Sequence, residues 1–311
     1  MDGISEMTNC RGPSKNQTDF RSRNCGNPLC WQLSFLPIQT LMLPASSSSK
    51  VYECCATPPS KAPSVAIQRD SPRPWRMSRS PRSAPLRGAN PMRVVCISDT
   101  HELHRELTVP PGDLLIHAGD FTFFGKGKRA IVDFNAWLGE LPHPSKVITC
   151  GNHEFALEAD PNLRKLITNA TLLLNESVIV GPAKIWGSPL TQHYGGAFGR
   201  SNAVDRVRAY SSVPSDADII ITHGPPFGLL DLTEEYPGPS GDRELRDAIL
   251  RVKPVLHVFG HAHGGYGVLR TTNTCFVNAA LFDLDGSLNK RPIVLEISRF
   301  KQHDGSSPIV A

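Results

Sequence analysis

The feature that most constrains the fold of this chain is a series of polar motifs, each of which follows a short apolar run. Such runs, bounded by polar residues, are typical of β-strands that are buried on both faces. In open α/β sheets the carboxyl ends of the strands lie at one edge, so residues far apart in the sequence can meet there. We therefore expect the motifs to share one cleft. In chain order they are Asp99-Thr100-His101, Gly119-Asp120, Gly151-Asn152-His153-Glu154, His223-Gly224 and Gly260-His261-Ala262-His263.

The apolar runs alternate with helical patterns, which predicts an α/β architecture with a largely central sheet. Segments 129–140 and 242–252 place apolar residues at helical spacing. Either Asp242 or Ser240 is a suitable N-cap for the second helix, and Pro254 helps to end it. The buried strands are expected at 93–98, 113–118, 146–150, 218–222 and 254–259.

Other segments favour antiparallel strands and a second sheet packed on the first. Segments 172–180 and 183–186 predict a hairpin around Gly181-Pro182. Further strands are expected at 266–270, 275–279 and 293–297.

The first 91 residues differ in composition from the rest of the chain. They carry twelve Lys or Arg against five Asp or Glu, a net charge of +7, whereas the remainder carries 21 against 24, a net charge of −3. This basic segment, rich in Ser, Pro and Arg, has few regularly spaced apolar residues and cannot offset its ordering entropy. We therefore predict a disordered tail at 1–91, one folded domain at 92–300 and a short polar tail at 301–311.

Cysteine usage and hydropathy bear on the compartment. Five of the eight Cys lie in the tail, and none shows the paired spacing of a zinc ribbon. This pattern favours reduced thiols in an intracellular, cytoplasmic protein, although the tail could carry a targeting signal. No segment is long and apolar enough to predict a transmembrane helix. The sequence does not indicate an oligomeric state.

The motifs supply the donor atoms of a site for two divalent metals. Asp99 and His101 lie two residues apart, so extended backbone would direct both toward one ion. The two oxygens of Asp120 could each bind one metal, and Asn152 offers a neutral oxygen. Two metals that share a carboxylate are typical of phosphoester hydrolysis. Further His donors follow the later strands, namely His223, His261 and His263.

Each motif taken alone also has a structural interpretation. Asp and Asn often cap strand ends or helices, Gly-Asp often forms a turn, and a lone His after a strand is often a structural residue. The order and completeness of the set favour the metal site over these alternatives. His117 and His257 lie within predicted strands and are expected to pack in the core. His193, in a Gly-rich loop, is a candidate substrate contact.

The ordered set resembles that of the calcineurin-like metallophosphoesterase superfamily over about residues 92–300. Segments 256–267 and 276–279 are similar to those of its metallophosphoesterase domain-containing subgroup. The resemblance implies a four-layer αββα sandwich with two mixed sheets. It implies a first metal held by Asp99, His101, Asp120 and His263, and a second held by Asp120, Asn152, His223 and His261.

The resemblance also assigns roles in catalysis. His153 matches the catalytic histidine of the superfamily, and Asp120 and Asn152 belong to the same catalytic group. Asn152 would also bind substrate, together with His193. The mixed oxygen and nitrogen donors suit Mn²⁺ first, with Fe, Zn²⁺ or Mg²⁺ as alternatives.

One departure from the superfamily bears on the substrate. Protein Ser/Thr phosphatases of this superfamily extend the second motif to Gly-Asp-x-Val-Asp-Arg-Gly, in which the Arg binds a monoester dianion. Here Phe124 stands at the position of that Arg. This disfavours a protein phosphatase and favours a small phosphodiester, such as a cyclic nucleotide.

Two other functions compete with that of a phosphodiesterase. A weakly active or non-catalytic metal-binding scaffold with the same fold is one alternative, because fold alone does not imply catalysis. A nuclease would need a basic groove, and the net charge of −3 over residues 92–311 argues against nucleic acid as a partner.

Overall fold

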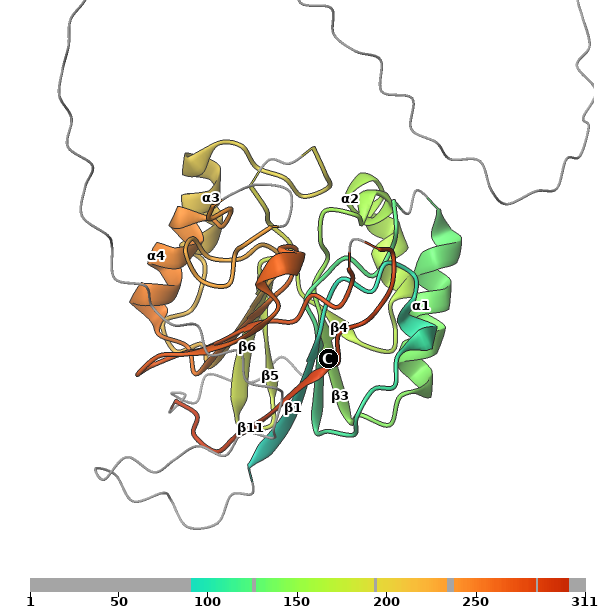
Figure 1. The fold of residues 1–311 in the computed structure, drawn as a ribbon, viewed down its shortest axis with the longest axis horizontal. Coiled ribbons are helices and arrows are strands. Elements are labelled where there is room, and N and C mark those ends of the chain that lie inside the picture. The colour runs from blue at the N-terminus through green and yellow to red at the C-terminus, as the bar shows by residue number, and fades with distance from the viewer. Residues whose placement is uncertain (1–90, 125–126, 193–194, 234–237, 284, 302–311) are drawn as a thin grey trace, which may run out of the picture. The chain divides into compact units, whose positions relative to one another are not determined.

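The computed structural model describes residues 91–124, 127–192, 195–233, 238–283 and 285–301, which form two mixed β-sheets with flanking helices (Figure 1). The predicted disordered tail at 1–91 and the predicted polar tail at 301–311 lie almost entirely outside these residues, so both stay predictions. No helix within the described ranges has the length and apolar character needed to cross a membrane.

The first sheet has the strand order β11-β1-β2-β3-β4. Strands β1 to β4 run parallel, and β11 pairs antiparallel with β1 at the edge. Its strands are β1 (Met92–Ile97), β2 (Leu114–His117), β3 (Ser145–Ile148), β4 (Thr171–Leu172) and β11 (Ile293–Ile297).

The second sheet has the strand order β5-β6-β7-β8-β10-β9. Its four inner strands run parallel, and both edge strands, β5 and β9, are antiparallel to their neighbours. Its strands are β5 (Glu176–Val180), β6 (Ala183–Ser188), β7 (Ile219–Thr222), β8 (Leu256–Phe259), β9 (Gly267–Arg270) and β10 (Cys275–Asn278).

Strand β1 shows why the inner strands are apolar throughout. Successive side chains of a strand point to opposite faces. Val94 and Cys96 pack between the sheets, in a core to which both sheets contribute, whereas Val95 and Ile97 pack against helices on the outer face. Because both faces are covered, an alternating polar pattern would bury unpaired polar groups.

The helices form the two outer layers (Figure 1). Helices α1 (Lys128–Glu140) and α2 (Phe155–Ala159) cover the outer face of the first sheet. Helices α3 (Ala203–Tyr210) and α4 (Arg243–Val252) cover that of the second. The predicted four-layer αββα sandwich is therefore confirmed. Among the described residues, the connections contain three short 3-10 helices, η1 (His104–Glu106), η2 (Pro161–Leu166) and η3 (His263–Gly265).

The predicted elements agree closely with the structure, with three differences. The five apolar strands do not share one central sheet: three belong to the first sheet and two to the second. The predicted strand at 172–180 is two strands, one in each sheet, because the chain crosses between sheets and turns at Asn175, whose φ is +64°. Helices α2 and α3 were missed: α2 has only five residues, and in α3 Val204 and Val207 face solvent and obscure the apolar stripe.

Two strand histidines, His117 and His257, are fully buried, as predicted. The Nε2 atom of His117 lies 3.0 Å from the Thr100 hydroxyl, and that of His257 lies 2.9 Å from the Thr222 hydroxyl. Burial lowers the pKa of each imidazole to about 3. Both side chains are therefore neutral members of the core at neutral pH.

We predict that His257 contributes to acid destabilisation. Between pH 6.5 and 3 the unfolded chain binds a proton at this residue that the folded chain does not, so folded stability falls as pH decreases through this window, by up to about 1.4 kcal/mol per pH unit. Above pH 6.5 both states are neutral at this site and the effect vanishes. Urea unfolding of His257→Gln at several pH values should give a correspondingly shallower pH dependence. Parallel curves for wild type and variant would contradict the assignment.

Candidate metal centre

The seven predicted metal ligands come together at the carboxyl ends of strands from both sheets. Asp99, Asp120 and Asn152 follow β1, β2 and β3, whereas His223 and His261 follow β7 and β8. The sheets meet at this edge, where the backbone N–H of Leu281 donates to the Ser98 carbonyl at 3.0 Å. The remaining two ligands, His101 and His263, lie two residues further along their loops.

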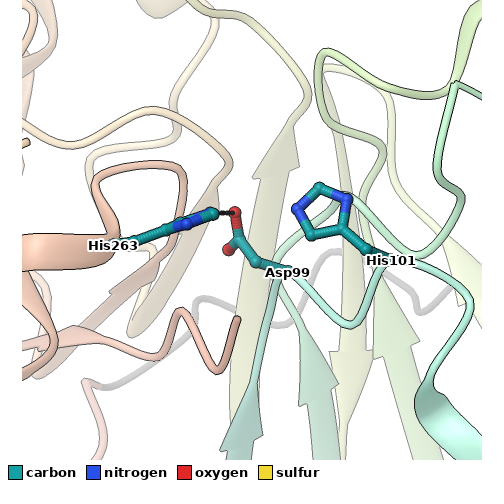
Figure 2. A group of neighbouring side chains, drawn as sticks. All are labelled: Asp99, His101 and His263. Atoms are coloured by element: carbon teal, nitrogen blue, oxygen red, sulfur yellow. Dashed lines mark hydrogen bonds and ion pairs between the residues drawn. The ribbon is translucent and has the colours of Figure 1, made fainter. Parts of the chain in front are cut away.

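One group of ligand atoms contains Asp99, His101 and His263. Their ligand atoms lie within 4.8 Å of one another. Figure 2 shows the Asp99 carboxylate between the two imidazoles, with His263 Nε2 3.1 Å from its Oδ1. Burial would raise the pKa of Asp99, but the hydrogen bond from His263 and the nearby histidine charges outweigh it and hold the pKa well below its usual range. The carboxylate is therefore ionised and ready to bind a cation.

A second group contains Asp120, His223 and His261, again with ligand atoms within 4.8 Å of one another. His223 Nε2 lies 3.2 Å from Asp120 Oδ2. The Oδ1 atom of Asn152 lies 2.9 Å from His223 Nε2 and 2.8 Å from His261 Nδ1. A carboxylate, an amide oxygen and two imidazoles thus converge on one point.

Asp120 also joins a third group, with His101 and His153. Its Oδ2 lies 3.9 Å from the Nε2 atom of each of these histidines. Asp120 therefore stands between the ligands of the two predicted metal positions. His153 lies as close to Asp120 as His101 does, so distance alone does not separate the predicted catalytic histidine from the predicted ligands.

Hydrogen bonds to backbone carbonyls fix the orientation of two ligand rings. The Nδ1 atom of His223 lies 2.9 Å from the Ala118 carbonyl, and that of His101 lies 3.3 Å from the Thr122 carbonyl. A carbonyl can only accept, so each Nδ1 carries a hydrogen, and in the neutral ring the Nε2 lone pair is left for a metal. This arrangement is usual for metal-binding histidines.

The imidazole charges respond to the carboxylates. Burial lowers the pKa of His223, but the negative charge of Asp120 and their hydrogen bond outweigh it and raise the pKa to about 9. Burial and the charge of His223 lower the pKa of His261 to about 4. A metal would therefore have to displace a proton from His223, whereas His261 is already neutral.

The ligand backbones are unusual. Four of the ligand residues have φ values in the left-handed region, which residues other than Gly rarely adopt. They are Asp99 at +54°, His101 at +43°, Asp120 at +55° and His261 at +65°. Each such residue costs on the order of 1–2 kcal/mol. Strain of this kind is characteristic of functional sites, where the surrounding structure holds it in place.

Two motif glycines allow the close approach of the ligands. A Cβ atom on Gly260 would collide with the Asp99 carboxylate. A Cβ atom on Gly151 would collide with Asp120 Oδ1 and the His223 ring. The glycines of these motifs therefore provide the space in which the donors converge.

Glu154 has a role that sequence reasoning missed. Its place in the motif suggests that it orients His153. Its carboxylate instead accepts hydrogen bonds from the backbones of the two loops that follow β2 and β3. These come from the backbone N–H groups of Asp120 at 3.0 Å, Thr122 at 2.9 Å and Gly151 at 2.5 Å. Burial and the charge of Asp120 raise its pKa to about 7. Glu154 thus ties the loop after β2 to the loop after β3.

The predicted catalytic histidine, His153, lies at the opening of the site. Its Nδ1 accepts from the Phe124 backbone N–H at 3.4 Å, which leaves Nε2 as the protonated atom of the neutral ring. Its side chain is 16% exposed, more than that of His101 at 3%. His193, the predicted substrate contact, lies outside the described residues.

The donor set of two carboxylates, an amide oxygen and four imidazoles fits divalent metal binding. The sequence pattern of the calcineurin-like phosphoesterase family matches residues 92–265. This chain belongs to the calcineurin-like phosphoesterase family. The predicted resemblance is thereby confirmed, and family membership supports a metal-dependent phosphoester hydrolase.

Relatives of this family member align with about two thirds of the chain. A UPF0046 protein of Caenorhabditis elegans is 36% identical over 232 residues, which are 70% of this chain and 79% of the relative. Metallophosphoesterase domain-containing protein 1 of Homo sapiens is 35% identical over 231 residues, which are 66% of this chain and 71% of the relative. Among solved structures, TT1561 of Thermus thermophilus aligns at 13% identity and a TM-score of 0.42, covering 61% and 91% of the two chains.

Proposed function

We propose that this chain is a dinuclear-metal phosphodiesterase that acts on small phosphodiesters such as cyclic nucleotides. The observation that carries the proposal is the position of Asp120. Its carboxylate belongs to two of the ligand groups: Oδ2 lies 3.2 Å from His223 Nε2 and 3.9 Å from His101 Nε2. A carboxylate shared in this way suits two ions rather than one.

Each of the two metal positions would draw its donors from both sheets. When bound, two divalent ions supply Lewis acidity toward the phosphoryl oxygens and lower the pKa of water. Mn²⁺ is the proposed metal, and Fe, Zn²⁺ and Mg²⁺ also match the oxygen and nitrogen donors. The first ion would be held by Asp99, His101, Asp120 and His263, and the second by Asp120, Asn152, His223 and His261.

His153 is the proposed general acid. The ring would act as the imidazolium: its Nε2–H, on the side of Asp120 where the reacting phosphate would sit, would donate its proton to the oxygen of the leaving group and leave a neutral imidazole. Protonation at Nδ1 would break the 3.4 Å bond from the Phe124 N–H, which belongs to the neutral ring. Asn152, at the second ligand group, would contact a phosphoryl oxygen as well as the metal, and His193 is proposed as a further substrate contact.

The loop after Asp120 supports a diester rather than a monoester. Residues 121–124 are Phe, Thr, Phe and Phe, so this loop offers no cation for the second negative charge of a monoester. A diester carries one charge fewer and can present an organic group to these apolar side chains. The location inside the cell and the exclusion of nucleic acid remain proposals from the sequence.

The proposal is tested on the purified full-length protein, with and without Mn²⁺. We expect about two metal ions per chain by elemental analysis, and metal-dependent hydrolysis of bis-p-nitrophenyl phosphate and cyclic nucleotides that exceeds hydrolysis of p-nitrophenyl phosphate. Tight metal binding without hydrolysis would support the scaffold alternative. Faster cleavage of the monoester would overturn the diester assignment.

A further inference from the structure

Three phenylalanine side chains, Phe123, Phe124 and Phe282, stand at the edge of the metal centre, and we call them the aromatic rim. Phe123 and Phe124 are 49% and 56% exposed. Phe282 is partly buried and lies beyond residues 92–265, the part that matches the family pattern. Exposed phenyl rings beside a polar site are unfavourable in water unless something covers them.

The rings contact the functional histidines directly. The Phe124 ring centroid lies 4.6 Å from that of His153, and Phe123 stacks on His153 at 5.9 Å with an interplanar angle of 26°. On the other side, Phe282 lies 4.6 Å from His101. The aromatic rim therefore contacts both the proposed general acid, His153, and His101, a proposed ligand of the first metal position.

The exposure of Phe123 and Phe124 is held by specific bonds. The Phe123 N–H donates to the Glu102 carboxylate at 3.0 Å, and the Phe124 N–H donates to His153 Nδ1 at 3.4 Å. Phe124 has a φ of +50°, a strained conformation for a residue with a side chain. A loop that bears strain and anchors its backbone while presenting two rings outward is built for contact with a ligand.

Phe282 is fixed by Lys290. The Lys290 ammonium donates to the Phe282 carbonyl at 3.1 Å and to the His263 carbonyl at 2.9 Å, and it pairs with Asp283 at 2.8 Å. The same cation thus ties Phe282 to the loop that carries a metal ligand. The third ring keeps its place relative to the site through this link.

We propose that the aromatic rim stacks on a planar aromatic group carried by the substrate on the leaving-group side. The substrates preferred by the enzyme would then be esters that carry either an aryl group next to the phosphate or a nucleobase one sugar away. This inference rests on the proposed function, because His153 defines the leaving-group side. Aromatic pairs gain energy from stacking beyond the burial of area, and base–aromatic stacking tolerates any base.

The test measures binding rather than turnover. Full-length protein loaded with Mn²⁺ is titrated calorimetrically with methyl-, cyclohexyl- and phenylphosphonate, which share one anionic group. We expect phenylphosphonate to bind about tenfold more tightly than methylphosphonate and more tightly than cyclohexylphosphonate, because only a flat ring can stack. A second pair, uridine 5′-monophosphate and ribose 5-phosphate, shows whether the base one sugar away gains the same advantage.

The variant Phe123→Leu/Phe124→Leu should reduce the phenyl preference to about twofold or less while it still binds methylphosphonate. Leu250→Ala, which trims a 57% exposed apolar side chain on α4, should leave the preference unchanged. Equal binding of all three phosphonates by wild type, or a preference that survives in the double variant, overturns the aromatic rim but leaves the phosphodiesterase proposal intact. If no phosphonate binds to the wild type, the result contradicts both the proposed metal site and the proposed stacking on the aromatic rim.

Discussion

Replacing Asp120 with Asn is expected to lower phosphodiester hydrolysis by at least about a thousandfold and to reduce bound metal to less than one ion per chain. The Asp120 carboxylate lies 3.2 Å from His223 and 3.9 Å from His101, ligands of the two separate positions. An amide has one oxygen and no negative charge, so it cannot bridge two cations. Since both ions take part in the chemistry, the loss falls on the whole rate enhancement that a two-metal site provides.

Elemental analysis after gel filtration, together with rates on bis-p-nitrophenyl phosphate, measures both effects. Asp218→Asn is the matched control, because Asp218 is equally buried and accepts from the backbone N–H groups of Lys184 at 2.9 Å and Lys301 at 2.6 Å. It precedes β7 and so lies at the end opposite the metal centre. We expect this control to lose stability but keep its metal. Full activity in Asp120→Asn would refute the two-metal proposal.

The second large effect is expected from His153→Ala. Removal of a general acid lowers turnover by about 10²- to 10⁴-fold. His153 is not one of the proposed metal ligands, and its side chain is more exposed than that of His101, so its loss should leave two ions per chain. The rate defect should be larger for a diester with an alkoxide leaving group than for one with p-nitrophenolate, because a good leaving group needs little protonation.

This prediction separates the two roles that the geometry allows His153. If His153→Ala loses one ion per chain, the residue is a ligand, as its group with His101 and Asp120 permits. If the variant keeps its metal and shows equal defects on both leaving groups, it is neither a ligand nor the acid. His104→Ala serves as the control. His104 is not one of the proposed ligands, and its Nε2 lies 3.0 Å from the Asp133 carboxylate.

The fold was largely predictable because burial on both faces leaves a simple record in the sequence. A strand such as 94–97 must be apolar throughout, and the polar residue that follows it marks the strand end. The assignment of strands to sheets left no such record, because a buried strand looks the same in either sheet. Hence the crossing at Asn175 and the pairing of β11 with β1 became clear only in the structure.

At the candidate metal centre, the convergence of the side chains was predictable and their local geometry was not. The order and completeness of the set of Asp, Asn and His that follow strands pointed to a shared metal site. The left-handed backbone of Asp99 or His261 has no marker in the sequence, because these residue types are not Gly. The role of Glu154 was missed for a related reason: besides the Thr122 hydroxyl, its partners are backbone N–H groups, which every sequence contains. Its position directly after His153, within the motif, was the available signal.

The ligands of the proposed site come from both sheets, and this has a consequence for folding. The first sheet contributes Asp99 and Asp120, and the second contributes His223 and His261. A chain in which only one sheet has formed holds an incomplete set of donors for either position. Hydrolytic chemistry is thus confined to the fully assembled domain, and partly folded chains carry no reactive centre that could attack phosphoesters indiscriminately.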